Sequence, residues 1–278
     1  MRPTEPTAAS STLDVTLDRL IQGPPVEVRW LTSTWVEGRR IDGVGHWMTA
    51  GGGTGAFRLV NRISDARNDH ELWQVGDGRV VWTRRQIGEE VRLHRIDLTR
   101  IARSEAAAPG RSVGGSRRDG QRSTLRIGGL VEMVDRLRTD HVLTRNAATL
   151  SDQPVWVVTA RPAGEGLQTR LTVLRSSAAS SDRPIVPSDP STAGPRGTSD
   201  QNPPTIDPNF VGYPVRIEWD RTDGDFTEPL MMIRLQRWRR TETPPPETFR
   251  FDAERSSADF VEETNRYLAR SGSGSLRR

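Results

Sequence analysis

The chain has 278 residues, enough for one large domain or two small ones. Hydrophobic residues make up 33% of it and the mean hydropathy is −0.63, so we expect part of the chain to be disordered. Forty basic residues oppose 36 acidic ones, the net charge is +4, and every basic residue is arginine. Because the arginines are spread along the chain with acidic residues between them, the composition argues against nucleic-acid binding.

Cysteine is absent, which excludes disulfides, thiol catalysis, Cys-ligated metal and a lipid-modified N-terminal cysteine. No stretch approaches the ~18 consecutive apolar residues of a membrane span. The first twenty residues lack the apolar core of a signal peptide. From these features alone we expect a soluble, unexported chain.

Three segments have the composition of linkers. Residues 1–10, 103–122 and 176–209 are rich in small and polar residues or in proline and have no periodicity. Such segments bury too little apolar surface to offset the entropy lost on ordering. We predict that they are flexible.

Between the linkers the pattern is mainly that of β-strands. Apolar residues alternate with arginine and other polar residues in segments 26–30, 55–63, 214–220 and 230–238. In the third segment Ile217 and Trp219 face one way while Arg216 and Glu218 face the other. Alternation with a period of two predicts antiparallel strands with one covered, apolar face and one wet, arginine-rich face.

Two amphipathic helices are predicted. Residues 11–23 begin with a Ser-x-x-Asp capping box, and residues 128–140 place Leu130, Met133, Val134 and Leu137 at helical spacing. Because neither helix is stable alone, both must pack on the apolar face of the sheet. The predicted fold class is therefore α+β.

Two glycine-rich stretches, QVGDGRVVW at 74–82 and MTAGGGTGAF at 48–57, invite comparison with phosphate-binding loops. A P-loop needs a lysine after its glycines, and a dinucleotide loop needs a helix after it. Here the glycines lead into strand-like runs and there is no lysine. Asp-Gly between such runs predicts a β-hairpin, so we interpret both stretches as hairpin turns.

No catalytic constellation is visible in the sequence. The four histidines (His46, His70, His94 and His141) share no metal-ligand spacing, and there is no G-x-S-x-G motif. The acidic pairs Glu89–Glu90 and Glu262–Glu263 are interpreted as solvated surface. The sequence therefore predicts no enzyme, no catalytic residue, no metal site and no cofactor.

Tryptophan is the unusual residue, with eight copies against two tyrosines. Most of the tryptophans fall in predicted strands. They either fill a core, which is the common role of tryptophan, or line an apolar cavity between the sheet and the two helices. Both interpretations stay open at this point.

Several motifs resemble those of LolA-like outer-membrane lipoprotein carriers. ELWQVGDGRVVWTRRQIGEEVRLHRIDLTRI resembles a strand–turn–strand unit of that superfamily, and GHWMTAGGGTGAFRLVNRI resembles the hairpin before it. GGLVEMVDRLRTD, VLTRNAATLSDQPVWVVTARP, PVRIEW, LMMIRLQRW and PPPETFRFDAE resemble its large planctomycete-type branch. The resemblance covers roughly residues 11–268.

The resemblance implies an incomplete antiparallel β-barrel, a half-barrel whose concave face is covered by short helices around an apolar cavity. It implies one domain over 11–268, with disordered tails at 1–10 and 269–278 and flexible insertions at about 103–122 and 176–209. Its better-known members carry lipoprotein acyl chains through the periplasm. This chain departs from the family in its N-terminus and in the long 176–209 insertion.

The leading prediction is a monomeric, non-enzymatic carrier of the periplasm or cell envelope. Its partners would be a lipid or acylated lipoprotein and an inner- or outer-membrane protein, with no nucleic acid. Strand parity gives the predicted cavity residues Val28, Trp30, Phe57, Leu59, Ile217, Trp219, Ile233 and Leu235, and the helix at 128–140 adds Leu130, Met133, Val134 and Leu137. Trp73, Trp82 and Trp156 are also cavity candidates, although their strands are apolar on both sides.

Two alternatives remain. One is a sensor or interaction module of the same fold that does not transport cargo. The other is an arginine-driven binder of anionic surfaces, which would show a steep dependence on salt.

Overall fold

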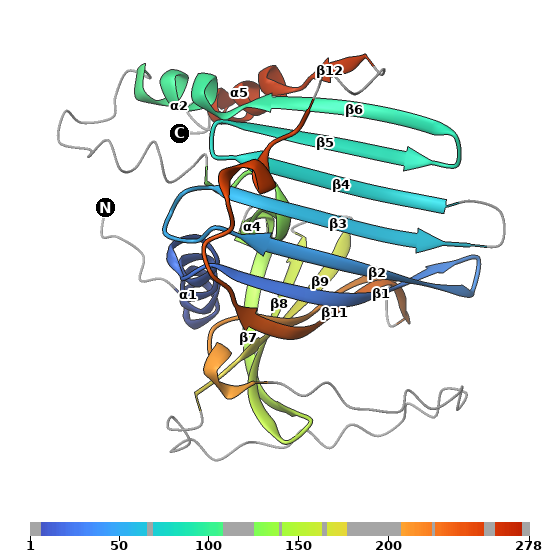
Figure 1. Cartoon of the computed structure of the whole chain (residues 1–278). Coiled ribbons are helices and arrows are strands. Elements are labelled where there is room, and N and C mark those ends of the chain that lie inside the picture. Colours follow the sequence, from blue (N-terminus) through green and yellow to red (C-terminus); the bar gives the residue numbers. More distant parts are fainter. Residues whose placement is uncertain are drawn as a thin grey trace.

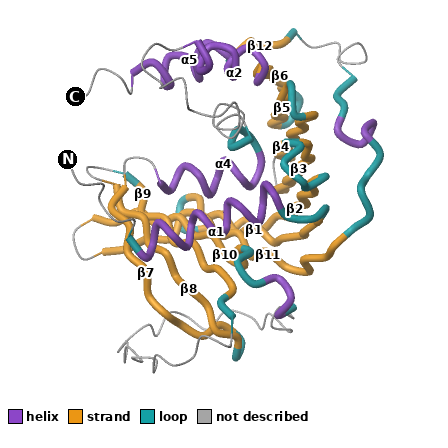
Figure 2. The backbone as a smooth tube through the Cα atoms, turned by 90° about the vertical axis from the view of Figure 1, so that its left-hand side faces the viewer, coloured by secondary structure: helices purple, strands orange, loops and turns teal. Residues whose placement is uncertain are grey.

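The structure is a computed structural model that describes residues 7–65, 69–107, 125–138, 141–162, 166–176, 207–223, 226–252 and 259–273. Twelve described strands form one curved sheet, and helices lie on its concave side (Figures 1 and 2). The sheet is an open half-barrel, which confirms the predicted α+β class. Among the described residues, no helix is long and apolar enough to cross a membrane.

The elements follow one another in a simple order. The first half contains α1 (Ala8–Gln22), β1 (Val26–Val36), β2 (Arg39–Thr49), β3 (Ala56–Ser64), β4 (Asp69–Asp77), β5 (Val80–Ile87), β6 (Glu90–Asp97) and α2 (Leu98–Ala107). The second half contains α4 (Gly129–Asp135), η1 (Arg136–Arg138), β7 (His141–Leu150), β8 (Gln153–Pro162), β9 (Leu167–Leu174), η3 (Pro208–Phe210), β10 (Pro214–Asp223), β11 (Phe226–Arg240), η4 (Pro246–Phe249), β12 (Phe260–Glu262) and α5 (Thr264–Ser273).

The strand order is β12-β6-β5-β4-β3-β2-β1-β11-β10-β9-β8-β7. All neighbours are antiparallel except β12, which pairs with β6 in parallel. The centre is β1, which joins β2 on one side to β11 on the other and so links two meanders that are distant in sequence. The edges β12 and β7 do not meet, and the barrel stays open.

Both glycine-rich stretches form hairpins, as predicted. Between β4 and β5, Gly78 has φ +84°, and the Asp77 carboxylate accepts hydrogen bonds of 2.8 Å from the backbone N–H groups of Arg79 and Val80. This Asp-Gly turn reverses the chain within two residues because glycine tolerates positive φ. The residues around it are therefore structural.

The helices differ from the prediction in extent. Helix α1 begins at Ala8, and Thr7 is its N-cap, with the hydroxyl accepting from the Ser10 N–H. Ser11, the predicted cap, lies inside the helix and donates to the Thr7 carbonyl. Because threonine caps helices as serine does, the helix begins after Thr7 and is one turn longer than predicted.

Parts of the predicted linker and tail are helical. Residues 103–107 form the end of α2, and α5 continues into the predicted C-terminal tail. These two helices pack on each other beside β5 and β6. The remaining parts of the predicted tails and insertions, 1–6, 108–122, 177–206 and 274–278, lie outside the described residues.

The convex face is not uniformly wet, which corrects the simple two-faced prediction. After β11 the chain crosses the convex side as a strap, residues 241–252, on its way to β12 (Figure 1). The strap packs Phe249 and Phe251 against Ala56 and Val75 in a second apolar cluster. The part of the convex face around this cluster is therefore covered.

Candidate functional site

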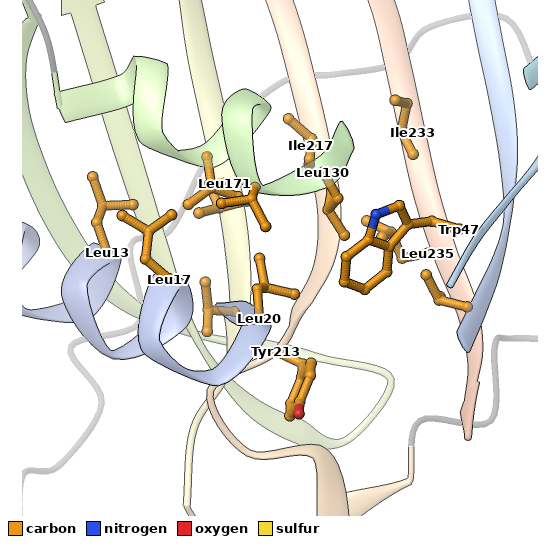
Figure 3. Close-up of a cluster of buried hydrophobic side chains, with 14 of the residues drawn as sticks. Leu13, Leu17, Leu20, Trp47, Leu130, Leu171, Tyr213, Ile217, Ile233 and Leu235 are labelled. Carbon is orange, nitrogen blue, oxygen red and sulfur yellow. The ribbon is translucent and has the colours of Figure 1, made fainter. Parts of the chain in front are cut away.

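The concave face holds the main apolar cluster, which α1 and α4 cover (Figures 2 and 3). Leu13, Leu17 and Leu20 of α1 are 0–2% exposed because they recur at helical spacing on the face that meets the sheet. Leu130 of α4 and Trp47 of β2 complete the contact. The helices thus bury one end of the concave face.

Most predicted cavity residues lie in this cluster. Ten are buried there: Val28, Trp30, Phe57, Leu59, Leu130, Val134, Leu137, Ile217, Ile233 and Leu235. Met133 and Trp219 are half-buried and pack against it. Strand parity placed these strand residues correctly on one face, but whether any of them binds a ligand stays a prediction.

The covered end is packed rather than hollow. Between α1, α4, β2 and β3 the free space is about 20 Å³, room for about one water molecule. Gly128 has φ +89°, and a Cβ there would lie 2.5 Å from the Phe57 ring. This glycine lets α4 rest directly on the sheet, so an apolar ligand can enter here only if α4 moves.

The other end of the concave face keeps apolar side chains half-exposed. They pack against the main cluster without being fully buried: Leu72, Leu143, Trp219 and Met231. Trp219 and Met231 are partners across β10 and β11. Leu72, Leu143 and Met231 were absent from the predicted set. Met231 shares the parity of Ile233 and Leu235, which is the signal that could have found it.

A polar contact separates the packed end from the half-exposed end. The side-chain oxygen Oδ1 of Asn61 accepts hydrogen bonds from Trp30 Nε1 at 3.0 Å and from the Thr32 hydroxyl at 2.9 Å. These bonds fix the Trp30 ring and satisfy polar atoms on an otherwise apolar face. Hydrogen bonds therefore fix the side chains of the concave face as far as Asn61, next to its half-exposed part.

Helix α4 is held by one carboxylate. Glu132 accepts from the Gly128 N–H at 2.8 Å and from the Tyr267 hydroxyl of α5 at 3.2 Å, and it pairs with Arg136. Burial, followed by the charge of Glu132, raises the pKa of Tyr267 to about 12, so the phenol stays protonated and keeps donating. The C-terminal helix thus fastens the helix that covers the sheet.

Trp73 and Trp82 do not belong to the concave face, which corrects their assignment. Register pairs Trp73 with Val60 and Trp82 with Val75, on the convex side. Both rings pack on Phe251 of the strap, at centroid distances of 5.3 and 4.9 Å. Their strands are apolar on both sides, so alternation alone could not choose a face.

Trp156 lies on the predicted concave side, but its ring contacts arginines rather than apolar side chains. It is half-buried, and the guanidinium carbons of Arg145 and Arg175 lie 3.8 and 4.7 Å from its ring centroid. Register places it on the same face as Val158, near α1, where Arg145 also donates to Thr12. Cation–π contacts take the place that apolar packing was expected to fill.

The titratable side chains are distributed as structural pairs. His94 lies 3.1 Å from Glu263, and Glu262 pairs with Arg95 at 2.6 Å, so the acidic pair predicted as solvated surface instead anchors β12 and α5 to β6. His46 lies 3.4 Å from Glu27. Within the described ranges no group of three or more such side chains gathers as a metal site would require.

No protein-family model and no curated protein matches the chain. The solved structures that are similar to it include the following three. MucB in complex with MucA(peri) has 11% identity and a TM-score of 0.38, covering 88% of this chain and 60% of that one. LprF from Mycobacterium bovis has 12% identity and a TM-score of 0.38, covering 87% and 99%.

The third is a putative outer membrane lipoprotein-sorting protein domain from Vibrio parahaemolyticus, with 7% identity and a TM-score of 0.34, covering 87% and 97%. This chain spans about 60% of the length of the MucB chain. The resemblance to the planctomycete-type branch stays a prediction.

Proposed function

We propose that this protein is a non-enzymatic carrier that binds the apolar chain of a lipid or acylated lipoprotein on its concave face. The observation that carries the proposal is a row of half-exposed apolar side chains, Leu143, Trp219 and Met231, which the strand register places in line and which continues a fully packed core. An apolar chain lying along the row would exclude water from it.

The binding energy can come from burial alone. Each buried methylene contributes about 0.8 kcal/mol, so ten of them contribute about 8 kcal/mol before the cost of association. No catalytic group is needed for this. The apolar chain of the ligand would first contact Trp219 and Met231. Outward movement of α4 would then lengthen the site towards Trp47 and Phe57.

The test is binding of an apolar dye, with native mass spectrometry and organic extraction of protein made in a bacterial periplasm. Trp219→Glu places a charge in the half-exposed row, and we expect dye affinity to fall by about tenfold or more because the carboxylate must be desolvated. Val142→Glu is the matched control, since Val142 is 62% exposed on the edge strand β7. Its affinity should not change.

Each outcome separates the two classes of function. Co-purified lipid that the dye displaces would support the carrier and identify its cargo class. A clean apo mass without dye binding would favour the sensor or interaction module, in which the face docks a partner. A folded Trp219→Glu protein with unchanged affinity would remove the concave site from the proposal.

The proposal includes an envelope location, a monomeric state and a membrane protein as donor or acceptor. Fractionation of cells that express the native gene tests the location, and native mass spectrometry tests the monomeric state. Recovery in the cytoplasm would contradict a carrier of envelope lipoproteins.

A further inference from the structure

The convex face carries a trough that the strap leaves open. It consists of two adjoining hollows of about 590 and 410 Å³ that share Leu31, Val44 and Arg62. They lie over β11, β1, β2 and β3, the centre of the sheet. We call this feature the arginine trough.

The trough follows from the register of three strands. Leu31 pairs with Val44, and His46 pairs with Val60, so three apolar side chains form a floor on the face opposite the main cluster. Val44 is 57% exposed although it lies in a central strand. Longer side chains on either side raise the walls: Arg29, Arg40, Arg58, Arg62, Arg234 and Arg237.

The charges in the trough are not balanced. The acidic residues at its border are already engaged: Asp42 with Arg40 and Ser33, and Glu71 with Arg62 and Arg84. Glu27, beyond the rim, pairs with Arg239 and lies near His46. Across the part of the chain that the structure describes, Arg29 and Arg58 form no ion pair. Their donors face the trough unneutralised.

His46 also lines the trough, beside Arg29 and Arg58. Burial is the main cause that lowers its pKa, Glu27 raises the pKa, and the smaller effects of the Arg29 and Arg58 charges lower it. Both guanidinium groups therefore act on the same point of the trough, where their charges would stabilise a negative group.

Two arginines in another part of the convex face are neutralised. In β9 and β10, Arg170 pairs with Asp220 at 3.0 Å and Arg216 pairs with Glu218 at 2.6 Å. A solvated arginine-rich face would look like this second region. The guanidinium groups of Arg29 and Arg58, which form no ion pair within the described residues, distinguish the trough from that region.

An extended peptide is a poor occupant for this trough. Peptides bind sheets through main-chain hydrogen bonds at an edge, whereas β1, β2, β3 and β11 are interior strands with neighbours on both sides. The trough offers only side-chain donors and an apolar floor. A phosphate group matches the planar guanidinium donors, and the carbons attached to it match the floor.

We propose that the arginine trough docks the protein on an anionic phospholipid surface, with a headgroup phosphate between Arg29 and Arg58. The glycerol and first methylene groups rest on Leu31, Val44 and Val60. This site is on the face opposite the proposed carrier site, so the protein can hold cargo while its convex face contacts a bilayer.

The experiment is co-sedimentation of the full chain with phosphatidylcholine vesicles that contain or lack phosphatidylglycerol. Wild type should bind only the anionic vesicles, and more weakly as salt rises past physiological strength, about 0.15 M. The Arg29→Gln/Arg58→Gln double variant should bind at least about tenfold more weakly, because each basic residue near such a surface contributes substantially. Neither arginine has an ion pair to lose, so the fold should persist, as circular dichroism would confirm.

The matched control is Arg79→Gln/Arg100→Gln. Arg79 and Arg100 are exposed and lie at the β4–β5 turn and in α2. Replacing them removes two positive charges, as the trough variant does, but at a distance from the trough. Control binding should stay within about twofold of wild type. Equal loss in both double variants would overturn the trough as a site and leave only net charge.

Three further results would contradict docking. Binding to vesicles of phosphatidylcholine alone would mean apolar adsorption. Release by inorganic phosphate, but not by chloride at equal ionic strength, would make the trough a site for free phosphate. Release by an acidic polypeptide at equal charge would favour a protein partner. Trp219→Glu should leave vesicle binding intact and Arg29→Gln/Arg58→Gln should leave dye binding intact, so the two proposals fail separately.

Discussion

The same alternation of side chains along the strands produces both faces of the sheet, but the concave face is covered by helices whereas much of the convex face is open. On the concave face the chain supplies its own cover, since α1 and α4 bury Leu13, Leu17 and Leu130 against the strands. On the convex face the strap covers only the part near Phe249, and the arginine trough stays open. What packs on a strand, rather than the strand itself, decides whether its face becomes core or surface.

This difference divides the molecule by role. The packed end of the concave face provides stability, its half-exposed end is the proposed cargo site, and the trough is the proposed membrane contact. If the division is right, substitutions on the two faces should affect different measurements. The predictions below test it, from the largest expected effect to the smallest.

Leu17→Ala should cost the most. Leu17 is 2% exposed between α1 and the sheet, and truncating a buried leucine typically costs about 2–5 kcal/mol of unfolding free energy. Urea denaturation followed by circular dichroism measures it. Val15→Ala, on the exposed side of the same helix at 53% exposure, should cost less than about 0.5 kcal/mol. Similar losses for the two variants would mean that α1 does not cover the sheet in this way.

The strands that build this core were predictable because their two sides differ in polarity. In VEVRW and PVRIEWD apolar and charged residues alternate, so Trp30, Ile217 and Trp219 were placed on one face from the sequence alone. In ELWQV, by contrast, Leu72 and Trp73 are adjacent apolar residues, and either could have faced inward. The strap partner Phe251, which decides the matter for Trp73, lies far along the chain.

The trough could not be predicted for a related reason. Leu31, Val44 and Val60 are isolated apolar residues among polar ones of the same parity, and each alone looks like ordinary exposed surface. Only the register of β1, β2 and β3 brings them together. The pairing of β1 with β11, about 200 residues away in sequence, then adds Arg234 to the wall. Long-range register is not readable from local pattern.

Trp82→Ala tests the covered part of the convex face. The ring is half-buried against Phe251 and Phe260, so we expect a loss of about 2 kcal/mol, less than for a fully buried tryptophan. Because the ring anchors the strap, limited proteolysis should also cut within 241–252 sooner than in wild type.

Trp35→Ala is the control for that variant. Trp35 is also half-buried, but it lies near the β1–β2 turn. It should cost less than about 1 kcal/mol and leave strap cleavage unchanged. Faster cleavage in both variants would indicate that general destabilisation, rather than a lost anchor, exposes the strap.

The smallest effect concerns His46 and follows from its depressed pKa. Burial holds this pKa below the ordinary value of 6.5; Glu27 opposes the shift, and the charges of Arg29 and Arg58 add a smaller lowering effect. In Arg29→Gln/Arg58→Gln the pKa should rise, whereas Arg79→Gln/Arg100→Gln should leave it unchanged. Titration of the His46 ring protons by NMR measures both.

The sign of the linked stability follows from the same shift. As pH falls, the unfolded chain protonates His46 before the folded chain does, so the unfolded state binds more protons. The contribution of His46 is therefore complete above pH 6.5 and is lost as pH falls through that value towards the folded pKa. In the double variant this loss should shrink. An unchanged His46 pKa in this variant would mean that the charges of Arg29 and Arg58 do not act on His46. It would then also argue against a phosphate site between these two arginines.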